Sequence, residues 1–211
     1  LAAEQGYAYA QNELGVLYRN GRGVPQDDQE SAKWFQLAAE QGNTQAKDNL
    51  SKLKRKSLRF EEIFRRAQQG HAYAQNELGV LYRNGRGVPQ DDQESAKWFQ
   101  LAAEQGNATA QYNLGVLYDN GQGVPKDYQE AFKWYRMAAD QGNITSQYNL
   151  GWLYRIGRGV PQDDQESAKW FQLAAEQGYA YAQNELGVLY RNGRGVPQDD
   201  QESAKWFQLA A

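Results

Sequence analysis

Cysteine is absent from the 211-residue sequence, and histidine occurs once, as His71. Without cysteine the chain cannot form a disulfide, a cysteine nucleophile or a cysteine-ligated metal site. A single histidine also excludes a multi-histidine metal site and most histidine-based catalytic sets. The missing cysteines leave the cellular compartment open, because they fit both oxidising and reducing surroundings.

Long apolar runs and an excess of positive charge are also missing. No apolar stretch approaches the roughly 20 residues that a membrane-spanning helix needs. No secretory signal is visible, although the sequence starts in the middle of a repeat, so a removed leader stays open. The net charge of −3 offers no basic field for nucleic acid. We therefore expect no membrane partner, no nucleic-acid partner and no cofactor.

The sequence consists mainly of copies of one 36-residue unit. With the terminal glycine taken as the end of each copy, the units are 7–42, 71–106, 107–142, 143–178 and 179–211, the last of them shorter. We expect three parts: a repeat segment over 1–42, a joint over 43–70, and a four-repeat solenoid over 71–211.

Each unit contains two helical patterns separated by a glycine-rich turn. In the first unit, helix A is expected from about Ala8 to Arg19, with apolar residues at the i, i+4, i+7 spacing of one buried face. The segment "NGRGVP" then ends it, because its glycines permit left-handed backbone and proline cannot continue a helix. Helix B is expected to start near Asp27, which has capping-box spacing to Glu30. Stacked copies of such a pair form an all-α solenoid.

The unit resembles the Sel-one-like (SLR) repeat, a relative of the tetratricopeptide repeat. The matching positions of the first unit are Ala10, Leu14, Gly15, Tyr18, Gly21, Gly23, Val24, Ala32, Trp34, Ala38, Ala39 and Gly42. The set recurs in the other units, with Phe132 in place of one alanine. The resemblance implies a right-handed superhelix of helix pairs whose A helices line the concave face. It also implies a scaffold or adaptor role in assembling other proteins.

The repeat breaks between residues 43 and 70. The first half of this segment begins like a helix A and continues with a polar tail, as a closing cap would. Its second half, "SLRFEEIFRRAQQG", resembles a helix B alone, as an opening cap would. Because 43–69 contain neither glycine nor proline, we expect one continuous helix, or two helices with a bend near Arg55–Ser57.

A second regularity explains the order of the two caps. Residues 1–39 are identical to 173–211, an offset of 172 residues. The chain therefore corresponds to a 172-residue parent joined tail to head near Lys56–Ser57. Three explanations are an engineered permutation or tandem fusion, a natural array with a long period, and a segment of a continuous assembly. If the end repeats lack caps, they are expected to stack or to exchange between chains.

Several motifs that suggest chemistry have simpler explanations. The aspartate pairs that begin at Asp27, Asp91, Asp163 and Asp199 lie at helix starts, where capping is expected. The glycosylation triplets at Asn107 and Asn143 are expected to be coincidental. Seven basic residues between 51 and 66 suggest an anion-binding surface, but a solvated cap helix is the favoured interpretation.

Five positions on the A helices of 107–142 and 143–178 vary between otherwise similar units. They are Tyr112, Asp119, Tyr148, Trp152 and Arg155. On a helical wheel they lie opposite the packing face, and exposed Trp, Tyr and Arg are favoured in binding hot spots. We expect this variable stripe to bind a partner, with neutral drift or lateral packing between repeats as the alternative.

These observations favour a non-catalytic scaffold that binds a peptide or a protein partner on its concave face. No nucleophile, base and orienting group can be assembled from the sequence, so an enzyme is not expected. The alternative is an engineered or self-assembling structural array without a retained ligand.

Overall fold

The computed structural model describes residues 2–211 and is entirely helical over that range, as expected. The A helices are α1 (Ala8–Asn20), α4 (Ala72–Asn84), α6 (Ala108–Asn120), α8 (Ile144–Ile156) and α10 (Ala180–Asn192). The B helices are α2 (Asp28–Glu40), α5 (Asp92–Glu104), α7 (Tyr128–Asp140), α9 (Asp164–Glu176) and α11 (Asp200–Ala210). The remaining helix, α3, covers Thr44–Gln68.

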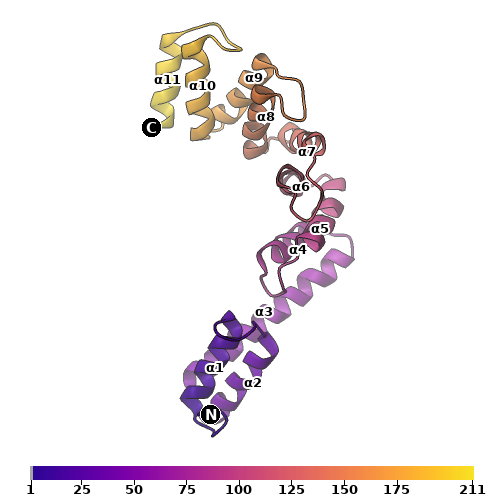
Figure 1. Ribbon diagram of the computed structural model, residues 1–211, viewed down its shortest axis with the longest axis vertical. Helices are drawn as coiled ribbons and strands as arrows, with labels where there is room; N and C mark the ends of the chain where they lie inside the picture. The colour runs from indigo at the N-terminus through magenta and orange to yellow at the C-terminus, as the bar shows by residue number, and fades with distance from the viewer. Residues whose placement is uncertain (1) are drawn as a thin grey trace. The chain divides into compact units, whose positions relative to one another are not determined.

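The chain divides into two compact units (Figure 1). The first unit ends at Glu62 and the second covers Ile63–Ala211. The boundary lies within α3, which continues without interruption through Arg55–Ser57. Of the two predicted alternatives, the single continuous helix is therefore the one observed. The first half of α3 packs on the first unit through Ala46, Leu50 and Leu53. In its second half, Ile63 and Ala67 are buried in the second unit.

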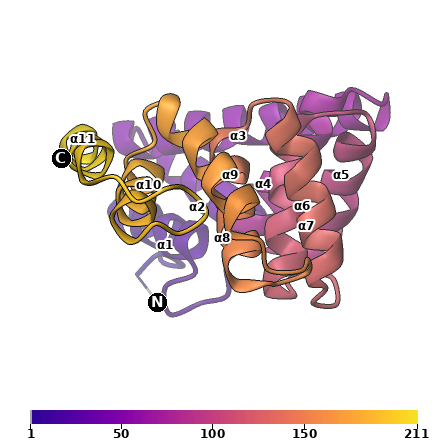
Figure 2. The same cartoon turned by 90° about the horizontal axis from the view of Figure 1, so that it is seen from above.

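Within each repeat, helix A and helix B approach closely because helix A has no side chain at the contact. A Cβ atom added to Gly15 would lie 2.7 Å from the Phe35 ring, and one added to Gly151 would lie 2.6 Å from the Phe171 ring. The hydroxyl group of Ser31 donates a hydrogen bond to the Gly15 carbonyl at 2.8 Å. The paired helices are visible side by side in the second unit as α6 and α7 (Figure 2).

Successive repeats of the second unit are joined by a buried glutamine on each A helix. The side-chain amide of Gln75 donates to the carbonyl of Ala67 at 3.1 Å, and Gln111 donates to the carbonyl of Ala103 at 3.1 Å. These carbonyls lie at the end of the preceding helix, where each also accepts a hydrogen bond from a following glycine N–H, that of Gly70 or Gly106, at 3.0 Å. Gln105 in turn donates to Gln75 at 2.6 Å, which satisfies the buried amide from its other side.

The glycine-rich turns have the left-handed conformation that their sequence predicts, and they also pack against the preceding repeat. Gly121 ends α6 in the left-handed region, with φ +71°. Two residues later, Gly123 (φ +68°) lies so close to the preceding repeat that an added Cβ would be 1.9 Å from the Asp92 carbonyl oxygen. The second glycine of the turn is therefore required by a backbone contact between repeats.

Each B helix begins with the predicted aspartate cap. One carboxylate oxygen of Asp27 accepts hydrogen bonds from the backbone N–H groups of Gln29 and Glu30, at 2.8 and 2.9 Å. The reciprocal half of the capping box is not observed, because the Asp27 N–H already donates to the carbonyl of Tyr18 at 3.0 Å. The Glu30 carboxylate instead forms an ion pair with Lys33.

Figure 1 shows the second unit as a curve, with α4, α6 and α8 toward its inner side and α5, α7 and α9 toward its outer side. The recurrent tryptophan of helix B is buried as Trp134, Trp170 and Trp206. Tyr135 stands where the other repeats have phenylalanine. Burial, and then the nearby Asp119, raise the pKa of its hydroxyl group far above the usual 10, and this hydroxyl is hydrogen-bonded to Asn149.

Replacement of Gly123 by alanine should destabilise the second unit more than replacement of Gly106. Both glycines have positive φ, which costs a residue with a Cβ about 1–2 kcal/mol. Nothing lies within 4 Å of an added Cβ at Gly106, whereas at Gly123 it would overlap the Asp92 carbonyl. Urea unfolding followed by circular dichroism measures both costs. Equal losses would contradict the backbone contact.

Tyr135→Phe should make the second unit more resistant to alkali. Because the pKa of Tyr135 is raised in the folded state, the unfolded chain loses the phenol proton first as pH rises above about 10. The free energy of unfolding, which is constant below that pH for this group, then falls by about 1.4 kcal/mol per pH unit until the folded pKa is reached. Urea unfolding at about pH 9 and about pH 11 should show a smaller loss for the variant. The exposed Tyr181→Phe serves as the control, and an identical loss in Tyr135→Phe and the unaltered chain would refute this account.

Candidate functional site

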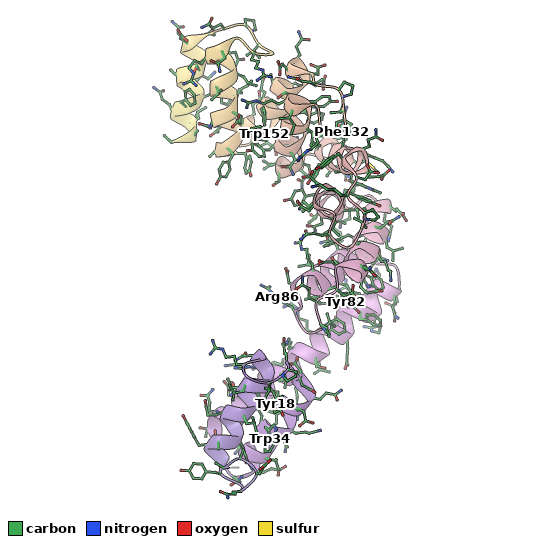
Figure 3. The ribbon with its side chains drawn as sticks, in the orientation of Figure 1. Tyr18, Trp34, Tyr82, Arg86, Phe132 and Trp152 are labelled. Carbon is green, nitrogen blue, oxygen red and sulfur yellow. The ribbon has the colours of Figure 1, made fainter. Side chains whose placement is uncertain are left out.

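The variable stripe predicted from the sequence lies on two neighbouring A helices of the second unit. Tyr112 and Asp119 belong to α6, whereas Tyr148, Trp152 and Arg155 belong to α8. Figure 3 labels Trp152 on α8, close to α10. All five side chains are half-buried. The five side chains are therefore less exposed than the helical wheel suggests.

The Tyr148 and Trp152 rings pack against α9, the B helix of the same repeat. The centroid of the Trp152 ring lies 6.2 Å from that of Phe171, in an edge-to-face contact. The Tyr148 ring lies 5.6 Å from the same phenylalanine. The wheel placed these side chains away from the packing face, but it considers one helix at a time and omits the other helix of the same repeat. Packing against α9 thus accounts for part of the stripe.

Tyr148 also belongs to a cluster of tyrosines that the sequence analysis missed. Its ring centroid lies 5.2 Å from Tyr179 and 6.3 Å from Tyr181, and these two rings are 5.6 Å apart. Tyr181 is 67% exposed. Burial, followed by the neighbouring Tyr148, raises the pKa of Tyr179. Tyr179 and Tyr181 recur in the first repeat as Tyr7 and Tyr9, so variation between repeats could not single them out.

Arg155 connects α8 to α10. It forms an ion pair with Glu185, and the two side chains are only 19% and 16% exposed. The Cζ atom of Arg155 lies 4.9 Å from the centroid of the Trp152 ring. The equivalent Arg83 also reaches the next A helix, where it donates to Asn113 at 3.2 Å. Arg155 therefore fixes the orientation of Trp152.

Asp119 replaces this arginine in α6. Its nearest cation is Arg158, whose Nη1 lies 3.8 Å from Oδ1 of Asp119. The guanidinium of Arg158 lies over the Tyr128 ring, with Cζ 4.3 Å from its centroid. The Oδ1 atom of Asp119 is buried without a hydrogen-bond partner, while the side chain as a whole is 27% exposed.

A sixth residue, Ile156, extends the surface and was not predicted. It follows Trp152 by one helical turn and is 51% exposed. The other A helices have asparagine at this position, as Asn20, Asn84, Asn120 and Asn192. The comparison between repeats contained this signal, because an exposed asparagine has become apolar. We use the name α6–α8 surface for Tyr112, Asp119, Tyr148, Trp152, Arg155 and Ile156.

The other candidate residues have structural roles. Asn107 and Asn143 accept hydrogen bonds from the backbone N–H groups of Ala110 and Ser146, both at 2.9 Å, and so cap their helices. His71 is exposed at the start of α4. Within residues 2–211, no three His, Cys, Asp or Glu side chains lie close enough together to hold a metal ion.

The basic part of α3 is partly neutralised by acidic residues of the first unit. Lys52 forms an ion pair with Asp48 at 2.7 Å, and Lys56 forms one with Asp28 at 3.1 Å. These pairs agree with the interpretation of a solvated cap helix. Across the described residues, every helix is too short or too polar to traverse a lipid bilayer.

Known structures with the same repeat resemble the chain over nearly its full length. A protective antigen of uropathogenic Escherichia coli with an SLR fold is 39% identical, with a TM-score of 0.70, and the match covers 99% of this chain and 46% of the antigen. A Sel1 repeat protein from Oxalobacter formigenes is 35% identical, with a TM-score of 0.68, covering 99% of this chain and 63% of that protein.

A fungal relative matches a shorter segment. The chitin synthase regulator SKT5 of Malassezia restricta is 33% identical over 112 residues, which is 48% of this chain and 8% of the regulator. The chain thus spans less than two thirds of each of these relatives. The profile of the Sel1 repeat matches residues 8–43, 72–107, 108–143, 144–179 and 180–211. With five repeats that cover most of its length, the chain belongs to the Sel1 repeat family.

Proposed function

We propose that the protein is a non-catalytic scaffold that binds a peptide or protein partner on the α6–α8 surface. The observation that carries this proposal is where the repeats differ. Units 7–42 and 179–211 agree at every shared position, and unit 71–106 departs from them only at His71. Units 107–142 and 143–178, in contrast, replace asparagine, arginine and valine by Tyr112, Asp119, Tyr148 and Trp152 on adjacent A helices.

The residue types and their support suit a binding surface. Tryptophan, tyrosine and arginine are enriched among the residues that contribute most to protein interfaces. Tyr148 and Trp152 rest on Phe171, and Arg155 is held by Glu185, so the side chains are ordered before a partner arrives. Ordering in advance lowers the entropy lost on binding. In Figure 1 this surface belongs to helices on the inner side of the curve of the second unit.

The family supports the same class of function. Sel1 repeat proteins are generally protein-interaction scaffolds. One relative of this chain is described as a regulator of chitin synthase and another as a protective antigen. These descriptions belong to the longer proteins, and we extend to this chain only the capacity to bind another polypeptide.

Restoration of the repeat consensus on α8 should abolish partner binding. The unaltered chain is used to select ligands from a phage-displayed library of random short peptides. The double variant Tyr148→Asn, Trp152→Val carries the residues of the other repeats, so its fold should be retained. Loss of a hot-spot aromatic residue costs about 2 kcal/mol or more, so affinity for the selected peptides should fall by at least about 30-fold.

The matched control restores the consensus on the outer helix α7 with Arg136→Gln and Met137→Leu. Both variants change two divergent residues, and circular dichroism checks that each stays helical. The control should bind the selected peptides as the unaltered chain does. If the α8 variant also binds them normally, or if the control loses binding equally, the α6–α8 surface is not the site.

A self-assembling structural array is a second candidate. The observation that favours it is the identity of residues 1–39 and 173–211, since identical repeats present identical stacking faces. Light scattering across a wide range of protein concentrations should then reveal species larger than one chain. A constant monomeric mass would remove this candidate.

A further inference from the structure

The last turn of the A helices in the second unit carries a row of charged side chains. Three of its four members are arginines, Arg83, Arg155 and Arg191, and the fourth is Asp119. Arginine is the favourable residue here, because the carboxyl end of a helix has a partial negative charge. Aspartate at this position lowers the stability of α6, so its presence calls for a compensating interaction.

The structure supplies only part of that compensation. Oδ1 of Asp119 is buried without a hydrogen-bond partner, a state that costs free energy. Arg158 approaches it to 3.8 Å, which allows Coulomb attraction but no hydrogen bond. The Tyr135 hydroxyl group is nearby and is hydrogen-bonded to Asn149.

The next repeat explains why Arg158 is placed in this way. There the equivalent loop arginine, Arg194, donates to the carboxylate of Asp164 at 2.9 Å. Tyr128 occupies the position of Asp164 in the preceding repeat, so Arg158 stacks on its ring instead. In the repeat 107–142 the negative charge thus lies on Asp119 of helix A and not on the first residue of helix B. The Asp119 side chain is 27% exposed.

The cations of the row are already engaged. Arg83 donates to Asn113 at 3.2 Å, Arg155 pairs with Glu185, and Arg191 lies 5.8 Å from the centroid of the Phe207 ring. An acidic partner would have to break these contacts and would be repelled by Asp119. A basic partner would leave these three contacts intact and would share the Asp119 carboxylate with Arg158.

An apolar contact area lies at the same end of the helices. Arg158, which reaches Asp119, follows Ile156 by two residues in the chain. Ile156 is 51% exposed and Trp152 lies one turn before it. Lysine and arginine have long aliphatic stems that pack on apolar surface while their charged ends bind a carboxylate.

We infer that the α6–α8 surface selects a polypeptide segment in which a lysine or arginine binds Asp119 beside an apolar side chain that covers Trp152 and Ile156. This inference rests on the proposed function and adds the chemistry of the partner. Asp119 supplies the charge selection, and the pair of α8 side chains supplies the apolar contact.

The test compares two selections from the same phage-displayed library of random short peptides, one on the unaltered chain and one on Asp119→Asn. Peptides selected on the unaltered chain should carry lysine or arginine next to an aliphatic or aromatic residue. This preference should be absent from the selection on Asp119→Asn. The affinity of the first set for the variant should be at least about tenfold weaker, and higher salt should reduce the difference.

Two further variants separate charge from packing. Asp119→Glu retains the carboxylate and should retain the preference for basic residues. Ile156→Asn restores the residue of the other repeats and should weaken binding without removing the preference for basic peptides. Circular dichroism and urea unfolding confirm that each variant is folded.

The possible failures are distinguishable. Peptides that depend on Tyr148 and Trp152 but show no basic preference, or bind Asp119→Asn equally well, would overturn the inference and leave the proposed function in place. A selection in which no peptide depends on Tyr148 and Trp152 would overturn both.

Discussion

The close contact between a glycine of helix A and an aromatic ring of helix B is the constraint on which the whole array depends. Gly79 meets Phe99 and Gly115 meets Tyr135, each with no room for a Cβ atom between them. Because the two helices approach this closely, the Ser95 hydroxyl reaches the Gly79 carbonyl at 2.8 Å. The helix pair is thus a single packed body whose outer surfaces are available for stacking.

Stacking then depends on polar groups that are buried in pairs. Each A helix inserts a glutamine against the carbonyl end of the preceding B helix, as Gln147 does with Ala139. The second turn glycines Gly123, Gly159 and Gly195 let their loops touch the preceding helix start, as Gly159 does at Tyr128. Both contacts require one register between repeats, because a shifted repeat would leave the buried glutamine amide without its acceptor. Apolar clusters such as that of Phe171, Leu186 and Trp206 add the bulk of the burial.

Since most of these contacts recur at the same positions in successive repeats, other positions are free to vary. The divergent side chains on α6 and α8 follow that rule, and they keep the fold while changing the inner surface of the second unit. Where Asp119 replaces arginine, the repeat loses a favourable helix end and a contact with the next helix. At the surface that we propose binds a partner, α6 is therefore less stable than the other A helices, and it lacks an interaction that other repeats have. Such conflicts between local preference and the fold are typical of functional sites.

The sequence by itself determined the helix pairs, the glycine turns and the aspartate caps, because each depends on backbone preferences and on a strict repeat. It also identified most of the α6–α8 surface, since Tyr112, Tyr148 and Trp152 differ from the repeated residue. Only the tertiary structure decided how these residues are used. It set Trp152 against Phe171, paired Arg155 with Glu185 and left Asp119 without a hydrogen bond. Those contacts join different helices, and a periodic pattern within one helix contains no information about which neighbour a side chain meets.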